Sequence, residues 1–142
     1  MEKQYYTLKE ALSIAQEIDP RVPQLRSLSR WRVHRCIPGP VMYSYDSGRV
    51  GLYTEELVIS LLVTTKLNKD RGFSIYEIAN AYAAYQSTGM GPMTIITTTN
   101  EMSTDRAYEA FTAYKQVRHE VESMLREKQL QVKLKHDRIL GK

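Results

Sequence analysis

Apolar residues recur at helical spacing in five stretches of the chain, and the first of these follows a short polar lead. Over residues 8–18 they repeat every three or four positions, which predicts an amphipathic helix. Thr7 and Glu10 fit a capping box at its start. Asp19 and Pro20 end it, because the residue before proline is pushed out of the helical conformation.

A second helix is predicted close behind, over residues 23–34. Pro23 suits its first turn, where the missing amide hydrogen costs nothing. At 100° per residue the apolar side chains Leu25, Leu28 and Trp31 turn inward. The opposite side carries Arg26, Ser27, Arg30 and His34. Two short helices joined by a brief turn, the second of them basic on its outer side, are typical of a helix-turn-helix.

The pattern then changes to the two-residue alternation of a hairpin. Pro-Gly-Pro at 38–40 closes the preceding unit, and residues 41–45 form a run rich in β-formers. Residues 46–48 are a turn signal, and 49–53 return as the second strand, with Arg49 near the tip. A hairpin directly after a helix-turn-helix is the arrangement called a winged helix.

Two more helices are predicted after the hairpin. Thr54 caps the third helix, which ends before Gly72. Its expected buried stripe is Leu57, Val58, Leu61, Leu62 and Thr65. Ser74 and Glu77 form a second capping box, which opens the fourth helix. One side of that helix carries Ile75, Ile78, Ala79, Tyr82 and Ala83.

Residues 86–103 have the composition of a linker, with a candidate short strand or extended arm in the β-branched run 94–99. A long helix follows from 104 to about 136, roughly 50 Å at about 1.5 Å per residue. An apolar stripe on a helix of that length favours a partner, most simply a second copy in a coiled coil. The alternative is that the helix folds back onto the N-terminal core.

The stripe supplies the residues predicted for oligomerisation: Phe111, Tyr114, Val117, Val121, Met124 and Leu125. Arg118, Glu122 and Arg126 are spaced four residues apart on what is expected to be an exposed face. Beyond it, residues 126–142 carry six Lys or Arg against two acids. This basic tail either frays or contacts nucleic acid.

Charge is distributed unevenly along the 142 residues, whose net charge is +4. Residues 20–45 contain no Asp or Glu, and the stretch 26–35 holds four arginines and a histidine. Such a span indicates a surface kept clear for a polyanion. The alternative is that these arginines pair with acids elsewhere in the fold.

Several other classes of protein lack their signals in this sequence. The single cysteine, Cys36, allows no intramolecular disulfide or multi-cysteine zinc site and is expected to be buried. No apolar run approaches the ~20 residues that span a bilayer, and no signal-peptide core is present. His34, His119 and His136 are scattered, and no catalytic or phosphate-loop motif occurs. We therefore expect no enzyme, no cofactor, no metal and no membrane.

Two segments carry a family resemblance: Leu-Tyr-Thr-Glu-Glu-Leu at 52–57, and Lys-Asp-Arg-Gly-Phe-Ser-Ile-Tyr-Glu-Ile at 69–78. Together with the order of elements they resemble the DNA-binding domain of MerR-type transcription regulators, over about residues 5–85. The long helix corresponds in position to that family's dimerisation helix. Where the family has Arg-Tyr-Tyr-Glu in its second helix, this chain has Ser-Arg-Trp-Arg at 29–32.

The resemblance implies a mainly α protein in three parts. These are a winged helix-turn-helix DNA-binding domain at 1–85, a linker at 86–103, and a long coiled-coil oligomerisation helix with a basic tail at 104–142. It further implies a bacterial, cytoplasmic protein associated with the nucleoid. The family's metal sensors carry cysteines around the dimerisation helix, and none occurs here after Cys36, so heavy-metal sensing is not expected.

The expected function is sequence-specific binding of double-stranded DNA by a homodimer or higher oligomer, most simply as a transcription regulator. The residues expected to contact DNA are Arg26, Ser27, Arg30, Arg32, His34, Tyr43, Tyr45, Arg49, Lys66, Lys69 and Arg71. Two alternatives stay open. One is a plasmid or phage segregation or architectural factor on the same domain. The other is a coiled-coil assembly protein that binds RNA or an acidic protein.

Overall fold

The computed structural model describes residues 5–46, 48–87 and 104–139, and the side chains as far as Lys128. The protein is mainly helical with one small antiparallel sheet, as predicted. Its elements are α1 (Leu8–Ile18), a 3₁₀ turn (Leu25–Ser27), α2 (Ser29–Val33), β1 (Met42–Ser44), β2 (Val50–Leu52), α3 (Glu55–Asp70), α4 (Ile75–Gln86) and α6 (Thr104–Ile139). The candidate strand at 94–99 lies outside the described residues.

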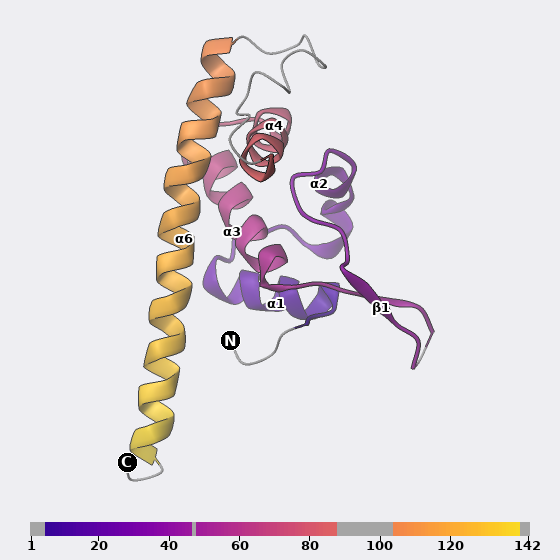
Figure 1. Ribbon diagram of the computed structural model, residues 1–142, viewed down its shortest axis with the longest axis vertical. Helices are drawn as coiled ribbons and strands as arrows, with labels where there is room; N and C mark the ends of the chain where they lie inside the picture. The colour runs from indigo at the N-terminus through magenta and orange to yellow at the C-terminus, as the bar shows by residue number, and fades with distance from the viewer. Residues whose placement is uncertain (1–4, 47, 88–103, 140–142) are drawn as a thin grey trace.

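Helix α3 is the centre of the fold, with α1, α4 and α6 packed around it (Figure 1). The predicted stripe is confirmed, but burial extends over nearly the whole circumference from Leu57 to Leu67. Two of the three buried hydroxyls on this helix are satisfied within it, whereas the buried Thr64 hydroxyl has no hydrogen-bond partner among the described residues. Ser60 donates to the carbonyl of Glu56, and Thr65 donates to that of Leu61. A helix surrounded on all sides in this way holds the other elements in fixed positions.

Helix α1 and the hairpin join the core as the sequence predicts. Thr7 and Glu10 form both hydrogen bonds of the capping box, and α1 ends at Ile18. The hairpin is held at its base by two backbone hydrogen bonds between Tyr6 and Tyr53, of 2.8 and 2.7 Å. Both capping boxes predicted from the sequence are confirmed, since Ser74 and Glu77 open α4 in the same way.

The second helix is shorter than predicted. A 3₁₀ turn precedes α2, and Gln24 before it provides no side-chain cap, so no continuous helix starts at Pro23. Leu28 and Trp31 are buried as expected. The prediction that Leu25 turns inward is wrong, because this side chain lies in the 3₁₀ turn and is 41% exposed.

The long helix covers its own core. Helix α6 packs against α3 and α4 (Figure 1). Four of the residues predicted for oligomerisation, Tyr114, Val117, Val121 and Leu125, are buried within the chain, whereas Phe111 and Met124 are half-buried. The expectation that this stripe is open to a second copy is therefore corrected in favour of the folded-back alternative. A core this small needs the additional apolar surface.

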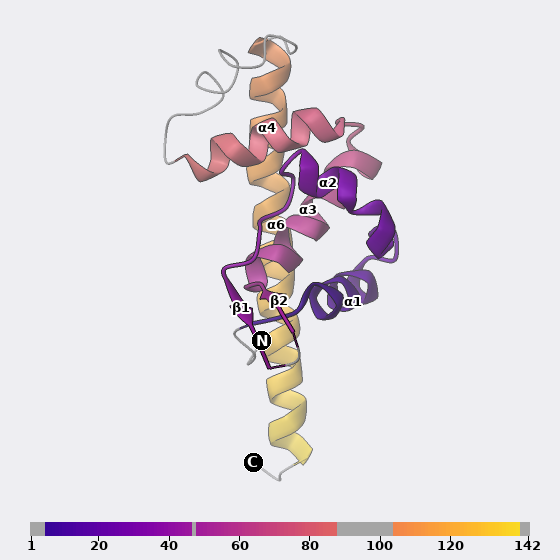
Figure 2. The ribbon, with the colours of Figure 1, turned by 90° about the vertical axis from the view of Figure 1, so that its right-hand side faces the viewer.

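The C-terminal part of α6 extends past the rest of the molecule (Figures 1 and 2). Among the described helices, α6 included, none is both long enough and apolar enough to cross a membrane.

Candidate nucleic-acid interface

Most of the predicted contact residues on and before α2 are at the surface. Arg26, Ser27, Arg30 and Arg32 are all exposed. They are positioned by the two inward side chains of this segment, since Leu28 and Trp31 anchor it to the core and leave the intervening positions outside. An element this short has room for only two anchors, so most of its remaining side chains face solvent.

These arginines have no acidic partners in the part of the chain that the structure describes. None of Arg26, Arg30, Arg32 and Arg35 forms an ion pair with a described carboxylate. The acid-free composition of residues 20–45 explains why none is near in sequence. Four exposed guanidinium groups without counter-charges create a positive potential that attracts polyanions.

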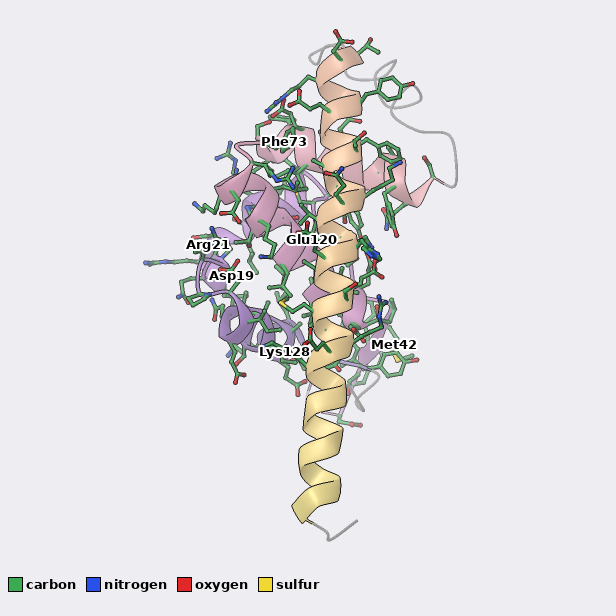
Figure 3. All side chains as sticks on the ribbon, turned by 90° about the vertical axis from the view of Figure 1, so that its left-hand side faces the viewer. Asp19, Arg21, Met42, Phe73, Glu120 and Lys128 are labelled. Carbon is green, nitrogen blue, oxygen red and sulfur yellow. The ribbon has the colours of Figure 1, made fainter. Side chains whose placement is uncertain are left out.

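Arg21, at the edge of the same acid-free span, behaves differently. Its guanidinium bonds Asp19 at 3.1 Å and Asp70, at the end of α3, at 2.5 Å. These hydrogen bonds hold the pKa of both carboxyls below their ordinary value of 3.8. The alternative of pairing within the fold is therefore correct for Arg21, which clamps the α1–α2 turn to α3. Asp19 and Arg21 lie together on one flank in Figure 3.

The hairpin contributes a second exposed group, on the flank opposite Arg21 in Figure 3, where Met42 is labelled. The Arg49 guanidinium carbon lies 4.1 Å from the centre of the Tyr43 ring. Tyr43 pairs with Gly51 in the antiparallel register, and alternation puts Arg49 and Tyr45 on that same side. Tyr45 is 71% exposed. The structure thus brings together all three predicted hairpin residues.

Helix α2 and the hairpin project from the same side of the molecule, with α6 on the other side (Figures 1 and 2). We use the name α2–hairpin surface for a set of exposed arginine, serine and tyrosine residues on the hairpin, on α2 and in the turns beside α2. Its members are Arg26, Ser27, Arg30, Arg32, Arg35, Tyr43, Tyr45 and Arg49.

Not every predicted contact belongs to that surface. Lys69 and Arg71 are exposed at the end of α3, and Lys66 is half-buried there. They lie beside the Arg21–Asp70 pair, and the charge of Lys66 helps to lower the pKa of Asp70. This second group is separated from the hairpin, although the α1–α2 turn connects it to the segment before α2.

His34 is less available than predicted. It is half-buried, and its ring centre lies 4.5 Å from that of Tyr76 at the start of α4. Next to it, Cys36 is fully buried as predicted, with its thiol bonded to the Ile75 carbonyl at 3.4 Å. Burial raises the pKa of this thiol to about 12. His34 and Cys36 therefore help to dock the end of α2 onto α4.

The structure contains a buried ionic group, not predicted above, where α3, α4 and α6 meet. Arg118, expected on an exposed face, is buried and grips the Glu56 carboxylate with two hydrogen bonds, of 2.8 and 2.5 Å. The Tyr82 hydroxyl donates to the same carboxylate at 2.9 Å. The guanidinium also lies 4.6 Å from the Tyr85 ring centre and near the Tyr114 hydroxyl. We call these five residues the three-helix cluster.

Nothing about the three-helix cluster suggests chemistry. Burial above all, with the Glu56 charge as a further cause, raises the pKa of the Tyr82 hydroxyl, so it stays protonated. A signal for Arg118 did exist in the sequence. It lies four residues after Tyr114 and three before Val121, inside the apolar stripe. A charged residue at such a position requires a partner.

A second ion pair holds the first turns of α6. Arg106 bonds the Glu77 carboxylate, and its guanidinium carbon lies 4.3 Å from the Phe73 ring centre. Burial opposes ionisation of Glu77, but hydrogen bonds from Arg106 and Ser74 prevail and lower its pKa. Arg106 and Arg118 on α6 are thus used for internal contacts, in contrast to the arginines on α2.

Comparison with protein-family models, curated proteins and solved structures finds no match to this chain. The chemistry of the α2–hairpin surface has to be judged from its own residues. Guanidinium groups bind phosphate and guanine edges through paired donors. Tyrosine hydroxyls and rings add backbone contacts and stacking.

Proposed function

We propose that this protein binds double-stranded DNA, with α2 as the recognition helix and the hairpin as the wing of a winged helix-turn-helix. One observation carries the proposal. Exposed arginines lie on α2 and on the hairpin, on the same side of the molecule, and none has a carboxylate partner among the described residues. Cations left free in this way release the counterions of a nucleic acid when they bind its phosphates.

In this proposal the contacts divide into two kinds. Arg26 and Arg30, with Ser27, read base edges in the major groove, because an arginine fork matches the two acceptors of guanine. The remaining groups fix the position on the duplex without reading its sequence. They are Arg32 on α2, the hairpin residues Tyr43, Tyr45 and Arg49, and the α3-end residues Lys66, Lys69 and Arg71.

The biological role proposed is regulation of transcription, supported by the resemblance of residues 52–57 and 69–78 to MerR-type regulators. A segregation or architectural factor would use the same contacts. Selecting bound fragments from genomic DNA separates the two roles. Isolated sites beside transcription starts support a regulator, whereas clustered repeats or dispersed binding without a common sequence contradict it.

The direct test of DNA binding is a salt titration, by fluorescence anisotropy, on a selected duplex and on a scrambled one. We expect Arg30→Ala to weaken binding to the selected duplex by roughly tenfold and to reduce discrimination, given ~1–3 kcal/mol per base-reading arginine. Lys115→Ala, which removes an exposed cation of α6 outside the basic tail, is the control. Unchanged affinity of Arg30→Ala for every duplex would exclude α2 as the recognition helix.

The same titration distinguishes the rival function of an assembly protein. An RNA stem-loop and an acidic peptide are added as competitors at matched charge. If either displaces the selected duplex at equal concentration, the surface is a general receptor for anions and the DNA proposal is wrong.

We also propose that the protein forms a homodimer. Because the apolar stripe of α6 is buried within the chain, the proposed contact between copies no longer uses that stripe. Residues 104–125 cover their own core, so in this proposal the contact between copies involves the part of α6 beyond it, at 126–139. Light scattering on the full chain and on a chain ending at Lys128 tests this. We expect the dimer only in the full chain. A truncated chain that still forms a dimer would place the contact elsewhere.

A further inference from the structure

Arg35 holds a backbone conformation that favours glycine. Its φ of 62° lies in the left-handed region, and it is the only described non-glycine residue with a positive φ. It follows the C-cap of α2, where the Cys36 amide bonds the Trp31 carbonyl and the Arg35 amide bonds the Arg32 carbonyl. This pair of bonds is the Schellman motif, whose left-handed position is usually occupied by glycine. A side chain at that position is strained.

The strained residue lines a groove. The groove has a volume of ≈ 710 Å³ and lies between the C-terminal end of α2, the segment after it, and the last turns of α4. Arg32 and Arg35 both line it, and both are exposed without a carboxylate partner among the described residues. Val33, which is 75% exposed, and Pro38 add apolar surface.

The floor of this groove is fixed. Tyr82 lines it from α4 and is only 2% exposed, and its hydroxyl donates a hydrogen bond to Glu56 in the three-helix cluster. The segment on the other side is anchored by the buried Cys36 and Ile37. The groove is therefore a preformed feature, and binding of a ligand to its two arginines requires no reorganisation of the core.

We propose that Arg32 and Arg35 hold a phosphodiester of the DNA backbone in this groove, with the sugar packed against Val33. The inference rests on the proposed function and adds Arg35 to the contacts of α2. Charge complementarity favours this occupant, because residues 20–45 supply no acid that would repel a phosphate. The strain at Arg35 is consistent with a functional site, where such conformations are concentrated.

The strained backbone provides an unusually clean test. Arg35→Gly removes the guanidinium and relieves the left-handed conformation at once. We expect its melting temperature to equal or exceed that of the unmodified chain, by on the order of 3 °C. We expect its affinity for the selected duplex to fall by about fivefold to tenfold, and the slope of log affinity against log salt to decrease by ~0.9. Misfolding cannot explain a loss of binding in a more stable variant.

A second variant tests the site without touching an arginine. An added Cβ at Gly39 meets nothing within 4 Å, and its φ is not positive, so a side chain fits there. Gly39→Asp places a carboxylate in the groove and should weaken duplex binding at least tenfold. Gly39→Ala adds bulk without charge, and its loss should stay below threefold.

The outcomes separate this inference from the function on which it rests. If Arg35→Gly and Gly39→Asp bind the duplex with unchanged slope while Arg30→Ala is weakened, the groove is not a phosphate site and DNA binding by α2 stands. If the unmodified chain binds no duplex, both proposals fail. If Arg35→Gly lowers the melting temperature, Arg35 has a structural role and the inference is overturned.

Discussion

The α2–hairpin surface and the three-helix cluster both contain arginines. These arginines are paired with a carboxylate in the cluster and, among the described residues, unpaired on the surface. In the cluster, Arg118 is buried against Glu56 and surrounded by tyrosine rings. On the surface, Arg26, Arg30 and Arg32 are exposed and have no carboxylate partner in the described part of the chain. The same residue type thus stabilises the fold on one side and remains available on the other.

This difference shows why net charge alone is a poor guide to an interface. The overall excess of +4 is small, and Arg21, Arg106 and Arg118 contribute little to an external field because each has an acid beside it. The distribution of the acids determines which cations are available. Each of the following changes tests one side of the contrast.

The largest effect is expected from Arg118→Ala. Removing one partner of a buried ion pair typically costs about 3–5 kcal/mol, and the Glu56 side chain, which is 29% exposed, can regain some hydration. We expect the free energy of unfolding to fall by about 2–3 kcal/mol in urea titrations monitored by circular dichroism. Arg126→Ala, on the exposed side of the same helix, should stay within ~0.5 kcal/mol.

A double-mutant cycle with Glu56→Ala identifies the cause. We expect a coupling energy above ~1 kcal/mol between positions 56 and 118. Additive effects would mean that Arg118 stabilises α6 through packing of its aliphatic stem.

The next largest effect is expected from arginines of the α2–hairpin surface. Arg26→Ala with Arg30→Ala should leave the free energy of unfolding within ~0.5 kcal/mol, because neither side chain is buried or paired. Affinity for the selected duplex should decrease by about 2 kcal/mol, roughly thirtyfold. Calorimetry and anisotropy on the same preparation measure both. A variant that loses stability but keeps its affinity would show that these arginines stabilise the fold and do not bind DNA.

A smaller loss is expected at the start of α4. Glu77→Ala removes the side-chain half of the capping box and the partner of Arg106, for a cost of about 1.5 kcal/mol. Glu77→Gln retains the cap geometry and should cost about 0.5 kcal/mol. Equal losses in the two variants would show that the charge of Glu77, not the cap, fixes the first turn of α6.

The smallest effect is a dependence on pH. Asp19, Asp70 and Glu77 have lowered pKa values, mainly through hydrogen bonds to arginine and, for Glu77, against the opposing effect of burial. Their contribution is present above the ordinary carboxyl pKa and is lost as pH falls through the lowered values. We therefore expect a lower melting temperature when the pH is reduced below about 4. Asp70→Asn should make this fall shallower, and an unchanged profile would contradict the role of the Arg21 clamp.

Local signals in the sequence predicted most of the elements. Both capping boxes, the stop before Gly72 and the hairpin depend on residues within a few positions of each other, and the structure confirms them. Leu25 was misplaced because a two-anchor segment without a cap forms a 3₁₀ turn in place of a full helix. The spacing of apolar residues does not distinguish these two forms over a single turn.

The long-range contacts were harder to predict. The apolar stripe of α6 is compatible with a second copy or with its own core, and only the burial of Tyr114, Val117 and Val121 within the chain decides between them. Arg118 and Glu56 are 62 residues apart, so no local pattern links them. The exposed positions on α2 were easier to anticipate, since Leu28 and Trp31 determine which side faces the core.

The single cysteine gives this protein a native thiol probe of local opening. Cys36 is fully buried where the end of α2 meets α4, and no other thiol competes with it. An aromatic disulfide reagent can therefore react only when α2 lifts from α4. Its rate of reaction measures how often that opening occurs, without any label being introduced. A duplex bound to α2 should lower the rate at which Cys36 is modified. The rate of thiol modification therefore reports whether DNA occupies the helix.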